Sequence, residues 1–281
     1  MSEPEPVLVV DLFPVERQHL LQLLAQLREE EWHRPTVCAG WTVKDIALHL
    51  LGDDIGRLSR DRDAFDYTSI ANAHPRINSW SELVAYINEM NELWVQATRR
   101  ISSRLLCTLL ALTGEEIYQY FTSLDLFALG GPVSWAGSAP APVWLDVARE
   151  YTERWVHQQQ IRDAVGRPGL KEQRFFAPIL ATFVRALPHT FREVDAPDGT
   201  LIHLNISGEA GSEWYLRREQ GTWKLEKTGG LHADASVTLD QERAWRLFTK
   251  GISKDEAIQH ATISGNELLA RKVFDTVSII A

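Results

Sequence analysis

The sequence predicts a chain in two parts: an α-helical N-terminal region, expected as a four-helix bundle, and a small α+β domain with an antiparallel sheet. Apolar residues recur every three or four positions through roughly the first 165 residues, which is the helical period. Beyond about residue 195 the period becomes two, which is typical of strands. Turns rich in glycine or polar residues separate these alternating segments. The change of period therefore places a helical domain before a sheet domain.

Four amphipathic helices are expected in the N-terminal region, each with an apolar stripe. They cover approximately residues 15–27, 43–58, 83–105 and 147–165. Thr42 and Asp45 stand three residues apart, as in a capping box, so the second helix should begin directly after Thr42. Gly166, followed by Pro168, should end the fourth helix.

The C-terminal part contains four short alternating segments, near residues 201–206, 214–216, 223–225 and 235–239. Helical patterns return at 242–249 and 266–276. These elements indicate a small α+β unit built on an antiparallel sheet. We therefore expect a helical domain over residues 1–170, a linker with some helical character over 171–195, and an α+β domain over 196–281.

Composition limits the classes of protein to which the chain can belong. Its 281 residues, 44% of them hydrophobic, can fill one large or two modest cores, which excludes a disordered chain. The 29 basic and 38 acidic residues give a net charge of −9, so no nucleic-acid partner is expected. Charges on helix faces are interpreted as solvated. No apolar run approaches the roughly 18 residues of a membrane span, and the N-terminus lacks a basic signal-peptide start, which predicts a cytoplasmic protein without a membrane partner. We expect a monomer or a homodimer.

The two cysteines, Cys38 and Cys107, form neither a CxxC pair nor a disulfide framework. Cys38 precedes the second helix, whereas His49 lies about two turns inside it, so these two side chains need not be close. We interpret Cys38 as a packed or loop cysteine and Cys107 as a core residue. Any reactive thiol is then expected to come from outside the protein.

The most informative spacing is that of Glu153 and His157, because residues four apart on a helix lie on one face. His49 lies near the edge of the apolar stripe of the second helix, so packing of the two helices could bring all three side chains together. Two neutral imidazoles and one carboxylate suit a catalytic zinc ion that keeps a further position open. The sequence therefore predicts a metal site at His49, Glu153 and His157.

Other interpretations of these residues stay open at this point. The Glu153–His157 pair alone is also typical of a surface contact between neighbouring helix turns. Asp45, Asp53 and Glu150 lie one helical turn from the candidates and could replace a ligand or accept a hydrogen bond from an imidazole. The same donor set suits non-haem iron, which leaves the identity of the metal open.

Several segments resemble the mycothiol-dependent maleylpyruvate isomerase family. Residues 38–50, Cys-Ala-Gly-Trp-Thr-Val-Lys-Asp-Ile-Ala-Leu-His-Leu, are similar to that family's N-terminal signature, which has proline in place of Ala39. Residues 91–95 and 148–157 resemble its later helices, and 233–239 with 244–247 resemble its small sterol-carrier-like domain. The resemblance spans nearly the whole chain and implies that the N-terminal region is a DinB-like four-helix, metal-binding bundle.

The same resemblance implies roles for individual residues. It makes His49, Glu153 and His157 the metal ligands, with Zn²⁺ as the usual ion and another divalent ion such as Ni²⁺ or Fe²⁺ as the alternative. It further implies a basic residue of the small domain near the substrate carboxylates, for which Arg246 and Lys250 are the nearest candidates. The cosubstrate would be mycothiol, a low-molecular-weight thiol.

The activity that the resemblance implies is cis–trans isomerisation of maleylpyruvate. A thiolate adds to the cis double bond, the resulting single bond rotates, and elimination returns the trans product, fumarylpyruvate. The same thiolate could attack another small electrophile and stay attached, which would make the protein an S-transferase.

Two other function classes are compatible with the sequence. A metal-dependent hydrolase would keep the three ligands but use metal-bound water, with Glu150 or a neighbouring acid as general base, and would turn over without added thiol. A non-catalytic module would bind a lipid or another small molecule at the C-terminal sheet and would need no metal.

Overall fold

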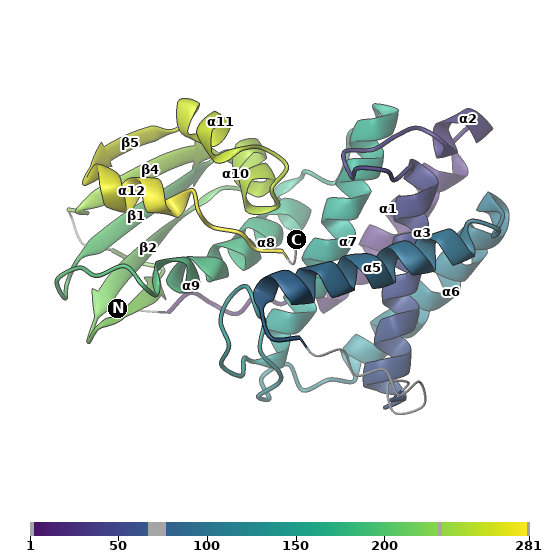
Figure 1. Ribbon diagram of the computed structural model, residues 1–281, viewed down its shortest axis with the longest axis horizontal. Helices are drawn as coiled ribbons and strands as arrows, with labels where there is room; N and C mark the ends of the chain where they lie inside the picture. Colours follow the sequence, from purple (N-terminus) through teal and green to yellow (C-terminus); the bar gives the residue numbers. More distant parts are fainter. Residues whose placement is uncertain (1–2, 67–76, 230–231, 280–281) are drawn as a thin grey trace. The chain divides into compact units, whose positions relative to one another are not determined.

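The computed structural model describes residues 3–66, 77–229 and 232–279. The chain divides into two compact units, which are drawn in Figure 1 and described separately below. We call Val10–Asp125 with Glu153–Leu170 the helical unit, and Met1–Val9, Leu126–Thr152 and Lys171–Ile280 together the sheet unit. The predicted combination of a helical N-terminal region and a sheet-containing C-terminal region is confirmed.

The helical unit is built from helices of very different length. Its elements are η1 (Val10–Leu12), α1 (Phe13–Ala25), α2 (Glu29–Trp32), α3 (Val43–Arg57), the π-helical η2 (Leu58–Arg62), α5 (Trp80–Thr98), α6 (Ser103–Thr122) and the second part of α7 (Val143–Val165). Helix α3 packs against both α5 and α6, and α6 also packs against α1. Helix α3 is therefore central to the unit.

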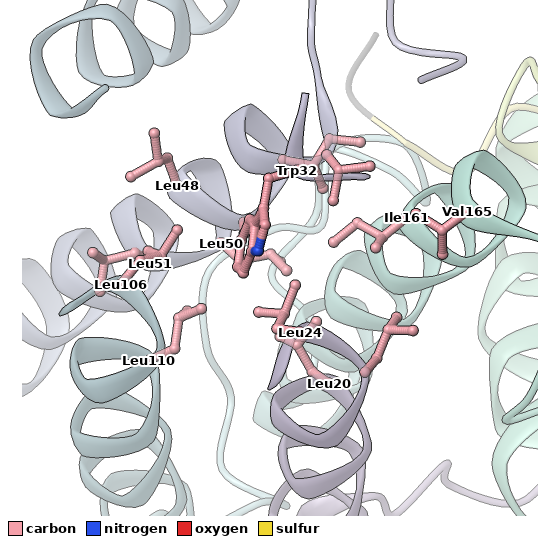
Figure 2. Packing of buried hydrophobic residues seen from close by; sticks show 14 residues of the cluster. Leu20, Leu24, Trp32, Leu48, Leu50, Leu51, Leu106, Leu110, Ile161 and Val165 are labelled. Carbon is pink, nitrogen blue, oxygen red and sulfur yellow. The ribbon is translucent and has the colours of Figure 1, made fainter. Parts of the chain in front are cut away.

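Leucine and isoleucine side chains from α1, α3, α6 and the end of α7 share one buried core, which surrounds Trp32 of α2 (Figure 2). On α3, Ile46 and Leu50 stand one turn apart, and both are almost completely buried. Burial of a side chain of this size stabilises a fold by about 1.5–3 kcal/mol. This packing holds α3 and the C-terminal half of α7 in fixed positions, and both helices carry candidate site residues.

Two of the predicted helix boundaries are confirmed by their capping interactions. The Thr42 side chain accepts a hydrogen bond from the Asp45 backbone N–H, and Asp45 accepts in return from the Thr42 backbone N–H, so α3 begins at a capping box. Helix α7 ends at Val165, and Gly166 follows with φ of +69°, the left-handed conformation that glycine adopts readily after a helix.

The third predicted helix, over 83–105, is wrong at its C-terminal end. Helix α5 stops at Thr98, and the separate helix α6 begins at Ser103 after its N-cap, Ser102, whose side chain accepts from the Leu105 backbone N–H. Ile101 and Leu105 therefore belong to different elements from Leu83. The apolar period continued across the break by coincidence, and the capping serine was the local signal of a new helix.

The sheet unit contains one five-stranded sheet with the order β3-β2-β1-β4-β5. Its strands are β1 (Leu201–Ser207), β2 (Ser212–Glu219), β3 (Thr222–Glu226), β4 (Ala235–Asp240) and β5 (Thr262–Gly265). The helices of this unit are α8 (Gln173–Phe183), η3 (Val184–Ala186), α9 (Leu187–Phe191), α10 (Gln241–Phe248), α11 (Lys254–Gln259) and α12 (Glu267–Val273), together with the first part of α7. Helices α9, α10 and α12 pack against the strands, and α8 packs against α10.

Neighbouring strands of the sheet are antiparallel except for β1 and β4, which run parallel with Leu204 opposite Val237. The sheet is thus mixed, whereas the alternating sequence pattern predicted an antiparallel sheet. Alternation encodes which side chains face the core but not the direction of the partner strand. The segment expected as a linker, 171–195, includes α8, η3 and α9 and is counted with the sheet unit.

Candidate metal centre

Three side chains from two helices of the helical unit converge on one point. His49 lies near the middle of α3, and Glu153 and His157 lie one turn apart on α7. Their ligand atoms all lie within 4.8 Å of one another. Glu153 Oε1 lies 2.9 Å from His157 Nε2 and 3.4 Å from His49 Nε2. The structure brings together the two imidazoles and the carboxylate that the spacing in the sequence selected.

The three donors differ in how accessible they are. The side chain of His49 is 6% exposed and that of His157 13%, whereas Glu153 keeps 34% of its side chain exposed. The two imidazole rings meet edge to face, with 4.6 Å between their centroids. The rings are therefore held by the protein interior, and Glu153 is the most exposed of the three side chains.

Opposite charges stabilise the Glu153–His157 pair. Burial raises the pKa of Glu153, but the neighbouring imidazoles of His157 and His49 outweigh this effect and hold the pKa of the carboxyl well below its usual range. Burial lowers the pKa of His157, but Glu153 outweighs it, and the net pKa of the imidazole lies well above its usual range. Without a metal, Glu153 is therefore a carboxylate and His157 an imidazolium, and the Nε2 proton of His157 lies between the two groups.

Asp45, one of the alternative ligands considered from the sequence, is engaged elsewhere. Its carboxylate accepts hydrogen bonds from the Thr42 backbone N–H at 3.0 Å and from Arg99 Nε at 2.9 Å. These contacts cap α3 and tie it to the residue that follows α5. Asp45 is thus a structural residue of the α3 N-terminus and not a member of the cluster.

The other two alternatives also lie outside the set of three donors. Asp53 stands one turn beyond His49 on α3, and its Oδ2 lies 3.3 Å from His49 Nε2, which is within ion-pair distance of that imidazole. Glu150 lies one turn before Glu153 on α7, and its carboxylate pairs with Arg149 at 2.6 Å.

Cys38 lies beside the helix that carries Glu153 and His157. Its Sγ stands 3.2 Å from Gln160 Oε1, and this oxygen lies 2.7 Å from His157 Nδ1. A hydrogen bond and an electrostatic interaction with Cys38 also contribute to the raised pKa of His157. Cys38 reaches this point because the loop before α3 folds back on itself: the Thr36 backbone N–H donates to the Trp41 carbonyl. Gln160 was missed, although it follows His157 by three positions on the same helix.

Trp41 supports the other imidazole. Its ring centroid lies 5.1 Å from that of His49, with the planes tilted by 51°. The indole N–H donates to Glu92 Oε2 of α5 at 2.8 Å, a hydrogen bond that lowers the pKa of Glu92. Trp41 is thereby fixed at both its apolar face and its polar edge, and it limits the positions that the His49 ring can adopt.

Arg246 and Lys250, the candidates for substrate contact, lie in the sheet unit. Arg246 is on α10, with its guanidinium carbon 4.4 Å from the centroid of the Trp245 ring. Lys250 follows α10 and has a left-handed backbone, with φ of +58°. The three candidate ligands belong to the helical unit, so a shared role for these two basic residues stays a prediction.

Comparison with known families identifies the helical region. Residues 13–162 match the model of the mycothiol maleylpyruvate isomerase N-terminal domain family. This match covers more than half of the chain. The chain belongs to this family. The resemblance inferred from residues 38–50 and 148–157 is confirmed, and so is the expectation that the protein is a member of an enzyme family.

A solved structure with a similar fold carries the same family name. A histidine-to-alanine mutant of the mycothiol-dependent maleylpyruvate isomerase is 12% identical, with 91% of each chain covered and a TM-score of 0.51. The unmutated isomerase is also 12% identical, with 85% of this chain and 86% of the other covered and a TM-score of 0.49. Sterol carrier protein 2 like 2 from Aedes aegypti is 20% identical over 35% of this chain and 95% of its own, with a TM-score of 0.28. The first of these likenesses shows a shared fold.

The search of curated proteins finds no match. Among the described residues, no helix combines the length and the apolar character needed to cross a membrane.

Proposed function

We propose that this family member is a metal- and thiol-dependent enzyme. In this proposal His49, Glu153 and His157 bind a divalent ion, mycothiol is the cosubstrate, and its thiolate attacks a small electrophile. The observation that carries the proposal is the convergence of the three donor atoms within 4.8 Å. The family match supports mycothiol as the thiol.

Two of the three separations between the donors suit a small divalent ion. Two atoms bound at about 2.0–2.1 Å to a tetrahedral ion lie about 3.3 Å apart. The separations of 2.9 Å and 3.4 Å from Glu153 Oε1 to the two imidazole nitrogens bracket this value. Nitrogen and oxygen donors in this ratio favour Zn²⁺, with Ni²⁺ or Fe²⁺ as alternatives.

A divalent ion held by three protein donors supplies positive charge that favours the thiolate form of a thiol at neutral pH. The chain's own residues prepare this state through a proton. His157 Nε2 must release the proton that it shares with Glu153 Oε1 before it can act as a neutral ligand. Glu153 stays ionised because its pKa is low, so the site supplies one negative charge to the ion.

The thiolate could complete either of two reactions. In isomerisation its sulfur forms a bond to one alkene carbon of maleylpyruvate, rotation follows, and the same carbon–sulfur bond breaks to release fumarylpyruvate and the thiolate. In S-transfer the carbon–sulfur bond is retained. We propose Arg246 and Lys250 as the candidates for binding substrate carboxylates, because the family resemblance implies a basic residue of the small domain in this role and both side chains are cationic.

The first experiment measures bound metal in the purified protein and in His49→Ala and His157→Ala. We expect the wild type to contain about one ion per chain and both variants to lose it. His33→Ala removes an exposed histidine of the helical unit and should keep the ion. Stoichiometric metal in both site variants, with the fold intact, would contradict the assignment.

The second experiment adds mycothiol and a panel of electrophiles that includes maleylpyruvate. We expect turnover only when both the ion and the thiol are present. Formation of fumarylpyruvate indicates the isomerase, and a stable thioether indicates the transferase. Turnover in the absence of any thiol would instead favour a metal-dependent hydrolase, and the absence of metal from the wild type would favour a binding module.

A further inference from the structure

His157 has two ring nitrogens, and each meets an oxygen atom of the same helix. Nε2 lies 2.9 Å from Glu153 Oε1, one turn earlier on α7, and is the nitrogen that points into the cluster with His49 Nε2. Nδ1 lies 2.7 Å from Gln160 Oε1, three residues later. The ring is thus held at both ends, and the contact at Nδ1 is the shorter one.

Because Nε2 of His157 points into the cluster, Nδ1 is the nitrogen that carries the hydrogen when the ring is neutral and acts as a ligand. A neutral imidazole that uses one nitrogen as a metal ligand carries its hydrogen on the other nitrogen, and this hydrogen requires an acceptor. Gln160 Oε1 is that acceptor. The same oxygen also accepts from the Cys38 thiol at 3.2 Å, so two donors meet at one amide oxygen. This arrangement fixes the orientation of the Gln160 amide, because its NH₂ group would face two donors if the amide were reversed.

We propose that Gln160 is a positioning residue that sets the ring orientation and tautomer of His157, and that Cys38 in turn holds the Gln160 amide. This inference rests on the proposed role of His157 as a metal ligand. A partner of this kind typically contributes a factor of 10–100 to metal affinity. The chemistry of Gln160 also matters: a neutral amide pulls on the Nδ1 proton less strongly than a carboxylate would, so Nε2 stays a moderate electron donor.

Cys38 reaches Gln160 because the loop before α3 is closed by backbone hydrogen bonds. The Trp41 backbone N–H donates to the Cys38 carbonyl at 3.0 Å, and an isolated bridge pairs Pro35 with Thr42. The loop therefore presents the thiol to α7, 122 positions further along the chain. This contact joins the loop directly to the residue that holds the ligand.

The test compares Gln160→Leu, which removes the acceptor, with Gln160→Glu, which keeps an acceptor oxygen. The measured quantities are the dissociation constant for Zn²⁺, obtained by chelator competition, and the visible absorption spectrum of the Co²⁺-loaded protein. We expect Gln160→Leu to bind Zn²⁺ about 10–100-fold more weakly than the wild type and to have an altered Co²⁺ spectrum. Gln160→Glu should bind Zn²⁺ as the wild type does. Gln18→Leu, an exposed position on α1, is the control and should leave both quantities unchanged.

Cys38→Ser, which keeps a donor hydrogen, and Cys38→Ala, which removes it, test the second contact. Cys38→Ala should weaken Zn²⁺ binding by a smaller factor than Gln160→Leu, and Cys38→Ser should behave like the wild type. Cys107→Ala replaces the other cysteine, on α6, and should have no effect on binding. An equal loss in the Ser and Ala variants would overturn the proposed role of Cys38.

A separate readout needs no metal. Proton NMR of the metal-free protein should show a downfield, slowly exchanging Nδ1–H resonance of His157 that disappears in Gln160→Leu and persists in Gln160→Glu. If the wild type binds no metal but shows this pattern, the proposed function fails and the positioning contact stands. Wild-type Zn²⁺ affinity in a folded Gln160→Leu, or an unchanged Nδ1–H resonance, would overturn the role of Gln160.

Discussion

The indole N–H of Trp94 on α5 donates a 2.7 Å hydrogen bond to the backbone carbonyl of Leu48, the residue before His49. This bond draws α5 against α3 at the point where α3 carries a candidate ligand. The approach requires a glycine, because a Cβ at Gly52 would lie 2.6 Å from Trp94 Nε1. Trp94 is a rigid, hydrogen-bonded ring and cannot move aside without losing this bond.

We therefore expect Gly52→Ala to destabilise the protein. Overpacking of this kind costs about 1–3 kcal/mol, which exceeds the gain of roughly 1 kcal/mol that alanine normally brings to a helix interior. The measurement is the free energy of unfolding in urea. Gly56→Ala is the matched control, because it lies on the same helix and its Cβ would meet no atom within 4 Å. The control should be neutral or slightly more stable, and equal effects in the two variants would contradict the packing argument.

A buried ion network joins four helices of the helical unit. The carboxylate of Asp54 on α3 accepts from Arg17 of α1 at 2.7 Å, from Arg154 of α7 at 2.8 Å and from the Thr113 hydroxyl of α6 at 2.7 Å. Asp54 and the side chains of both arginines are almost fully buried. Removal of the carboxylate charge would leave two buried guanidinium groups with only the neighbouring Glu16, whose own pKa is raised by burial, to balance them.

Asp54→Asn should therefore lower the free energy of unfolding by about 3–5 kcal/mol at neutral pH. Because Arg154 directly follows Glu153 on α7, we also expect weaker metal binding in this variant. Denaturation and metal competition measure the two effects. Asp11→Asn, at an exposed position in η1, should change neither quantity. A stable Asp54→Asn protein would show that the network is dispensable.

Local patterns explain why the three candidate ligands could be found from the sequence. The four-residue spacing of Glu153 and His157 and the position of His49 beside an apolar stripe both follow from helical geometry. Cys38 depends instead on a loop that reverses direction before α3, and a helical period does not describe such a loop. Gln160 follows His157 by three positions on the same helix, so its contact could have been found from spacing, whereas the approach of Cys38 was outside the reach of pattern analysis.

The interpretation of the charged residues on helix faces as solvated was wrong for three of them. Charged residues on predicted helices were expected to be solvated, yet Asp54, Arg17 and Arg154 meet in the interior. Each of them lies on a different helix, so only the tertiary packing reveals that their charges compensate one another. The same limit applies to the sheet, where the parallel pairing of β1 with β4 is a long-range feature.

The buried network also predicts how stability depends on pH. Burial alone would raise the pKa of Asp54, but Arg17 and Arg154 lower this pKa by a larger amount. The net pKa therefore lies below that of an unfolded aspartate. Its stabilising effect is present above the unfolded value of about 3.9 and is lost as the pH falls through the folded pKa. Urea titrations should therefore show a shallower loss of stability on acidification in Asp54→Asn than in the wild type. Asp11→Asn should follow the wild-type curve, and parallel curves for Asp54→Asn and the wild type would contradict the assignment.

The proton shared by Glu153 and His157 predicts that metal binding depends on pH. Because the pKa of His157 is raised, its imidazole carries a proton in the metal-free protein at neutral pH, and an incoming ion must displace this proton. Zn²⁺ affinity should therefore increase as the pH rises through the raised pKa, and it should level off above that value. Calorimetry at pH 7 in buffers with different ionisation enthalpies should show net proton release on binding. Heats that do not depend on the buffer, together with an affinity that is constant between about pH 6 and 9, would show that His157 is already neutral in the metal-free site.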